Sequence, residues 1–136
     1  MRYINLLLLI ITLANFGIAV HGQGNEDNSK LPDQKLENIK MYYFHYSRRC
    51  ATCNAVESVS KEAVNELYGE KVSFVDINLD DKAGKAKGKE LKVSGQTLLI
   101  VSGDTKINIT NEGFMNARNN PDKLKAVIKE KIDSLL

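Results

Sequence analysis

The sequence contains no tryptophan, and only 7% of its 136 residues are aromatic. It therefore lacks the aromatic surface on which single-stranded nucleic acids stack. It also lacks an excess of one charge, because 19 Lys and Arg residues are set against 17 Asp and Glu residues, for a net charge of +2. This balance gives no reason to expect a nucleic-acid or membrane-surface partner. With 43% hydrophobic residues, the chain is sufficient for one domain with a core.

The sequence also has few residues that could bind a cofactor or form a closed metal site. There is no glycine-rich fingerprint for a flavin or nicotinamide cofactor. A structural zinc site requires four ligands, and beyond residue 22 the soft candidates are Cys50, Cys53 and His45. A closed zinc site would need a carboxylate or a second subunit as well. We therefore expect no cofactor and no structural metal, and we expect His45, a lone histidine on a strand, to be partly exposed.

Residues 1–22 follow the three-part pattern of a secretory signal peptide. Arg2 precedes an apolar stretch, and Val20 and Gly22 are the small residues before a predicted cleavage site. Residues 3–20 make only 18 positions, which is short for a bilayer crossing, so cleavage is favoured over retention as an anchor. We expect a periplasmic or secreted protein with no stable membrane insertion after cleavage. Disulfides persist in such compartments.

The rest of the chain divides into a linker and one domain. Residues 23–37 are polar, rich in turn formers and without period, which is typical of a flexible linker. A domain follows at 38–136, in which periods typical of strands and helices alternate. Strands are predicted at 39–46 and 71–79, helices from 50 to 69 and over 80–93, a β-hairpin within 96–113, and a last helix beginning at Pro121.

This order of elements predicts the fold class. A strand–helix–strand–helix start implies parallel pairing with right-handed crossovers, and the closing hairpin adds antiparallel strands. The sequence therefore predicts an α/β fold of three layers, with a mixed central sheet of about four strands and helices on both faces.

The chain has only two cysteines, Cys50 and Cys53, in the stretch "HYSRRCATC". A C-x-x-C bridge closes too small a loop to stabilise a fold much. Cys50 falls where a strand gives way to a helix, so its thiolate would face unpaired helix N–H groups and the positive end of the helix dipole. Arg48 and Arg49 add positive charge of the same sense. An accessible thiolate followed by a shielded Cys53 suits thiol–disulfide exchange with a protein disulfide or dithiol partner.

Two other classes of function stay open for the same motif. Two or three thiolate-type ligands are enough to bind a soft ion such as Cu(I) or trivalent arsenic. The chain could also be a redox-silent subunit that docks a larger reductase through the edge near Gln96.

The strand, the C-x-x-C at a helix start, the "GQTLLIV" segment, the hairpin and the last helix together resemble the thioredoxin fold over residues 38–136. In thioredoxins a cis-proline stands opposite the dithiol, and this resemblance implies that Gln96 and Thr97 support the site. Because a non-proline cis bond costs about 3 kcal/mol, we expect Gln96 to be trans. Phe44 stands where thioredoxins carry a buried acid, and Arg49 stands where they carry a tryptophan.

More narrowly, "YYFHYSRRCATC" with "GQTLLIV" resembles the small exported thioredoxin-like proteins of the ArsF family of nitrophenyl-compound nitroreductase subunits, associated with arsenic-resistance operons. The residues that match this pattern are His45, Arg48, Arg49, Cys50 and Cys53. The resemblance implies a partner reductase subunit, in which any hydride chemistry would have to reside.

Overall fold

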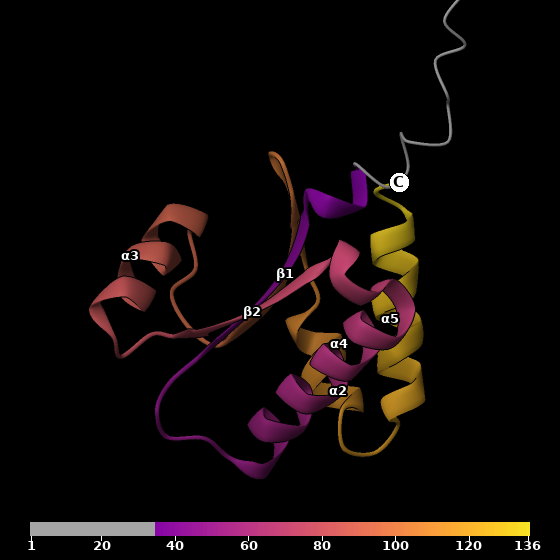
Figure 1. Cartoon of the computed structure of the whole chain (residues 1–136). Coiled ribbons are helices and arrows are strands. Elements are labelled where there is room, and N and C mark those ends of the chain that lie inside the picture. The colour runs from indigo at the N-terminus through magenta and orange to yellow at the C-terminus, as the bar shows by residue number, and fades with distance from the viewer. Residues whose placement is uncertain (1–34) are drawn as a thin grey trace, which may run out of the picture.

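The computed structural model describes residues 35–136, which are shown in colour in Figure 1. The predicted signal peptide and residues 23–34 of the predicted linker lie outside the described residues. Residues 35–37 form one turn of helix, and Leu36 packs against the core of the domain. Within 35–136, no helix has both the length and the apolar character that a bilayer crossing requires.

Four strands form one mixed sheet in the order β2-β1-β3-β4. β1 pairs with β2 in parallel and with β3 antiparallel, and β3 pairs with β4 antiparallel. This topology confirms the predicted three-layer α/β fold. The elements are β1 (Ile39–His45), α2 (Ala51–Tyr68), the 3-10 turn η1 (Gly69–Lys71), β2 (Ser73–Asn78), α3 (Lys82–Leu91), β3 (Thr97–Ser102), β4 (Thr105–Asn108), α4 (Thr110–Asn116) and α5 (Pro121–Asp133).

Side chains of the central strand β1 alternate between two cores. Ile39, Met41 and Tyr43 face the larger core, which α2, α4 and α5 cover. Tyr42 and Phe44 face a smaller core with Leu79 and Leu99, on the side of α3. In Figure 1, α3 accordingly lies on one side of the sheet and the other three helices on the opposite side. This burial on both faces explains why the sequence of β1 is almost continuously apolar.

The predicted hairpin ends earlier than the range 96–113, because a helix interrupts it. The side chain of Asn108 accepts hydrogen bonds from the backbone N–H of Thr110 at 3.0 Å and from its hydroxyl at 2.6 Å. The Thr110 hydroxyl also accepts from the backbone N–H of Leu98 at 2.9 Å. Such side-chain bonds to the backbone favour a helix start over a continuing strand. Gly113 then lets α4 approach β3, since a Cβ there would lie 3.1 Å from Leu98 Cδ2.

Candidate active site

The two cysteines lie at the start of α2, directly after the loop that follows β1. Cys50 is the N-cap of the helix, with φ −90° and ψ 168°, and its Sγ accepts the backbone N–H of Cys53 at 3.2 Å. The two residues form a disulfide with a Cα–Cα distance of 5.1 Å. Cys50 is exposed, whereas Cys53 is only 4% exposed on the inner face of the helix. The site therefore has one accessible sulfur and one shielded sulfur.

The segment before β3 lies against the dithiol because β3 pairs antiparallel with β1. This pairing places Thr97 beside Phe44, near the end of β1 that leads into the dithiol loop. The side-chain amide of Gln96 donates to Sγ of Cys53 at 3.4 Å, and the Thr97 hydroxyl donates to the carbonyl of Gly95 at 2.9 Å. No peptide bond within residues 35–136 is cis, so Gln96 is trans as expected. Gln96 thus supplies a side-chain donor to the shielded sulfur.

Arg48 and Arg49 have different environments, although the sequence suggested a shared role. Arg49 is partly buried and forms ion pairs with Glu57 of α2 and with Asp76 of β2, the latter at 3.3 Å. Two carboxylates therefore offset its positive charge. Arg48 is exposed and belongs to no ion pair found within the described part of the chain. The uncompensated cation beside Cys50 is consequently Arg48.

His45 is only 3% exposed, so the expectation of partial exposure is wrong. Its Nε2 lies 2.7 Å from Asp76 Oδ1, and its Nδ1 accepts from Nε of Arg49 at 3.1 Å. These bonds satisfy both ring nitrogens, which explains how the ring can be buried. Asp76 and Glu57 are the site residues that sequence reasoning missed. Asp76 could have been found only from the parallel register of β1 and β2, which pairs it with Tyr43. That register is known only once the sheet is assembled.

The aromatic side chains of β1 differ in whether they reach the dithiol. The Tyr43 hydroxyl donates to the carbonyl of Cys53 at 3.1 Å and so ties β1 to α2, and burial raises the pKa of this hydroxyl. Phe44, where the sequence resemblance implied an acid in related proteins, points to the opposite core, and its ring lies 5.9 Å from that of Tyr42. The position therefore offers no proton acceptor for Cys53.

The disulfide borders an open hollow of about 520 Å³. Its lining mixes a ring, two guanidinium groups and an amide with the two sulfurs, so both polar and apolar groups face the space beside the disulfide. Within 35–136, no three His, Cys, Asp or Glu side chains lie together as a metal site. The residues that line the hollow are Tyr46, Arg48, Arg49, Cys50, Cys53 and Gln96.

No protein-family model and no curated protein matches the sequence. Solved structures do match. Thioredoxin O2 from Arabidopsis thaliana, in an oxidized state, is 22% identical with a TM-score of 0.51 over 76% of this chain and 84% of that one. The Malassezia sympodialis thioredoxin Mala s 13 is 19% identical with a TM-score of 0.51, over 79% and 85%. Trxlp from Edwardsiella tarda is 15% identical with a TM-score of 0.51, over 75% and 92%. The chain therefore has a thioredoxin-like fold.

Proposed function

We propose that this protein is an exported thiol–disulfide oxidoreductase that exchanges disulfides with a partner protein through Cys50 and Cys53. The observation that carries the proposal is the exposed Cys50 sulfur at the N-cap of α2, bonded to a shielded Cys53 beside an open hollow. This asymmetry matches the two roles that the reaction needs, one sulfur that meets the partner and one that resolves the intermediate.

The reaction exchanges two electrons between the dithiol of this protein and the disulfide of its partner. In the reduced protein, the Cys50 thiolate attacks one sulfur of the partner's disulfide, whose other sulfur leaves as a thiolate. A mixed disulfide between Cys50 and the partner results. Cys53 then loses its proton and attacks the Cys50 sulfur, which forms the internal disulfide and releases the partner's second thiolate. Two electrons pass to the partner, and the steps reverse when the oxidised protein meets a partner dithiol.

Three features support Cys50 as the attacking thiolate. The N–H of Cys53 points at its sulfur, the positive end of the α2 dipole lies beside it, and the first turn of α2 contains no acidic residue. Arg48 adds a cation that no described carboxylate pairs. Each feature stabilises the charged form of the sulfur, so Cys50 becomes a nucleophile at neutral pH.

A Cys53→Ser variant of the reduced protein tests this role, because only the Cys50 thiol can then react. We expect iodoacetamide to alkylate it with a pH midpoint clearly below 8.5, the ordinary value for a free cysteine. The same variant, added to a lysate, should retain partner proteins as mixed disulfides that dithiothreitol releases. A midpoint of 8.5 or above in this variant, together with no insulin reduction by the wild-type protein, would refute the proposal.

Export is a separate part of the proposal, and the pattern of residues 1–22 supports it. The N-terminal sequence of the protein recovered from expressing cells checks it. We expect chains that begin at Gln23, outside the cytoplasm. Chains that keep Met1 and remain with the cytosol would contradict export but leave the dithiol chemistry standing.

A narrower proposal is that the protein serves as a subunit of a larger reductase, as the resemblance of its His45–Cys53 segment to the ArsF family implies. Its support is the sequence pattern alone. Affinity purification of the full chain under non-reducing and reducing conditions checks it. A flavin- or nicotinamide-dependent partner that persists after reduction would support a stable subunit, and its absence would contradict one.

Capture of a soft ion is the competing function, and the proximity of the two sulfurs favours it. Reduced wild-type protein and its Cys50→Ser variant, each mixed with arsenite or Cu(I), separate the two functions. One equivalent bound by the wild type and lost in the variant, without turnover of insulin, would support capture. Turnover without tight ion binding would support the oxidoreductase.

A further inference from the structure

A second hollow adjoins the one that contains the disulfide. It measures about 310 Å³, and Tyr46 lines both. The Tyr46 hydroxyl donates to the carbonyl of Ser94 at 3.4 Å, which connects the loop before Cys50 with the segment before β3. Tyr46 therefore lies at the boundary between the hollow beside the sulfurs and the hollow beside α3. The residues that line the second hollow are Tyr46, Leu79, Lys85, Lys89, Val93 and Ser94.

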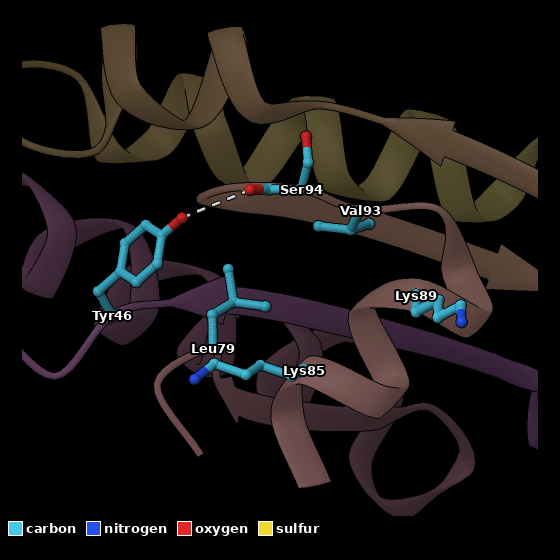
Figure 2. A pocket seen from close by; sticks show the side chains of 6 residues that line it. All are labelled: Tyr46, Leu79, Lys85, Lys89, Val93 and Ser94. Carbon is cyan, nitrogen blue, oxygen red and sulfur yellow. Dashed lines mark hydrogen bonds between the residues drawn. The ribbon is translucent and has the colours of Figure 1, made fainter. Parts of the chain in front are cut away.

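The interior of this second hollow is apolar and its rim is basic. In Figure 2, Leu79 and Val93 lie between Tyr46 on one side and Lys89 on the other, and the Lys85 side chain extends beneath Leu79 toward the Tyr46 side. Lys85 and Lys89 are its only charged lining residues. They are four positions apart on α3, so they project from the same face of the helix.

The charges of these two lysines are available to a partner. α3 contains four lysines and one glutamate, and that glutamate, Glu90, pairs with Lys87 at 2.7 Å. Neither Lys85 nor Lys89 takes part in an ion pair found within residues 35–136. Lys85 acts on the carboxylate of Asp80, but the pKa of Asp80 is lowered mainly by hydrogen bonds from Ser47 and only in part by Lys85. Its carboxylate accepts the backbone N–H of Ser47 at 2.7 Å and is thus already engaged.

Two glycines hold α3, and with it the lysine pair, against the sheet. Gly84 and Gly88 are buried on the inner face of the helix. A Cβ at Gly84 would lie 1.8 Å from the carbonyl oxygen of Asn78, and one at Gly88 would lie 3.1 Å from Leu79 Cδ2. This backbone contact fixes where Lys85 and Lys89 stand relative to the dithiol. The basic rim therefore belongs to a rigid element.

We propose that the two hollows form one docking groove for an extended, acidic segment of the partner protein, next to the disulfide that is exchanged. Carboxylates of the segment meet Lys85, Lys89 and Arg48, while an apolar side chain enters between Leu79 and Val93. This inference rests on the proposed function, and it names the substrate class of that site. Complementary charge at a rim mainly accelerates encounter and fixes orientation.

The test compares two disulfide-bridged probe peptides of equal length, each with one leucine. One has Asp and Glu on both sides of the leucine, and the other has Asn and Gln there. The reduced full chain should react with the acidic peptide roughly 5- to 10-fold faster in low salt, and the ratio should fall toward one in 0.5 M salt. A Lys85→Gln/Lys89→Gln variant should lose most of this preference. The matched control is Lys61→Gln/Lys123→Gln, which removes the same charge from α2 and α5 and should keep it.

The uncharged reagent 2,2′-dithiodipyridine distinguishes the two possible failures. If wild-type protein reacts with it but treats both peptides alike, or if both lysine variants lose the preference equally, the groove is refuted and the oxidoreductase stands. If the protein reduces neither reagent nor peptide, the proposed function fails. A cysteine-free acidic peptide, titrated into the protein, then tests the groove on its own. Changes in the NMR chemical shifts of the Tyr46 and Val93 backbone amides would support the groove, and their absence would refute it. Equal binding of both peptides, with cosedimentation on phosphatidylserine vesicles, would assign the lysines to a membrane surface and also refute it.

Discussion

The charges around Cys50 predict opposite effects for two neutralising substitutions. Glu57 of α2 pairs with Arg49 of the loop before the helix, and Arg48 has no such partner in the described structure. Glu57→Gln removes a negative charge from the site, so it should stabilise the Cys50 thiolate and raise its reactivity. Arg48→Gln removes a positive charge and should lower its reactivity. The sequence alone shows two arginines beside Cys50 and so predicts the effect of Arg48→Gln. It does not predict the effect of Glu57→Gln.

The size of the first effect follows from helix geometry. Glu57 is seven residues after Cys50, which at 1.5 Å per residue corresponds to about 10 Å along α2. A unit charge at about 10 Å contributes roughly 0.4 to 0.8 kcal/mol when the effective dielectric constant is about 40 to 80. At pH 7 this corresponds to a two- to fourfold increase in the thiolate fraction, because a tenfold change requires about 1.4 kcal/mol.

The assay is the rate of iodoacetamide alkylation of Cys50 at pH 7 in the Cys53→Ser background and in about 0.1 M salt, which screens the partly buried Glu57 only weakly. Glu62→Gln is the control, because Glu62 lies on the same helix but about 18 Å from Cys50 along its axis, beyond the screening length at about 0.1 M salt. We expect Glu57→Gln to accelerate alkylation two- to fourfold, Arg48→Gln to slow it by a similar factor, and the control to leave it unchanged. Equal rates in all three variants would show that these charges do not set the reactivity, and only the helix terminus would remain as its cause.

Three further predictions concern the scaffold of the site. Replacing the buried His45 with Ala should lower the free energy of unfolding by about 2–4 kcal/mol in urea titrations, because it leaves a cavity and removes two hydrogen bonds, and an unchanged midpoint would contradict this. Gly84→Ala should destabilise by about 2 kcal/mol or more, because the new Cβ meets backbone, while Gly95→Ala, with no atom within 4 Å, should stay within about 0.5 kcal/mol. Hydrogen bonds from Ser47 lower the pKa of Asp80, so its carboxylate stabilises the fold above its ordinary pKa, and this contribution is lost as the pH falls through the lowered pKa. Asp80→Asn should therefore melt at a lower temperature than wild type at pH 7, and the gap should close as the pH falls through the lowered pKa of Asp80; a gap that persists in stronger acid would refute the linkage.

Local patterns were enough to predict most of the fold. The strand at 39–46, the helix after Cys50 and the last helix at Pro121 each have a period and a boundary residue within the segment itself. α4 could not be predicted in the same way. Thr110 bonds locally to Asn108, but its hydroxyl also accepts the Leu98 N–H, and that second bond exists only after the sheet has formed.

The site residues also fall into those that local sequence patterns predict and those that depend on the assembled fold. Cys50 and Cys53 are neighbours in sequence, and the change from strand to helix that places them is visible in the pattern. The partners of Arg49 come from β2 and from two turns further along α2, so they depend on strand register and helix phase together. For the same reason, a histidine that looked unpartnered in the sequence is buried in the structure.

This arrangement gives separate roles to two arginines for which the sequence predicted a shared one. Arg49 links β1, β2 and α2 through His45, Asp76 and Glu57, and so fixes the loop that presents Cys50. Arg48 remains free to meet a partner or to favour the thiolate. Substitution of Arg49 should therefore change stability as well as reactivity, whereas substitution of Arg48 should change reactivity alone. Parallel measurements of unfolding and alkylation on the two single variants would separate these roles, and equal losses of stability would show that the division does not exist.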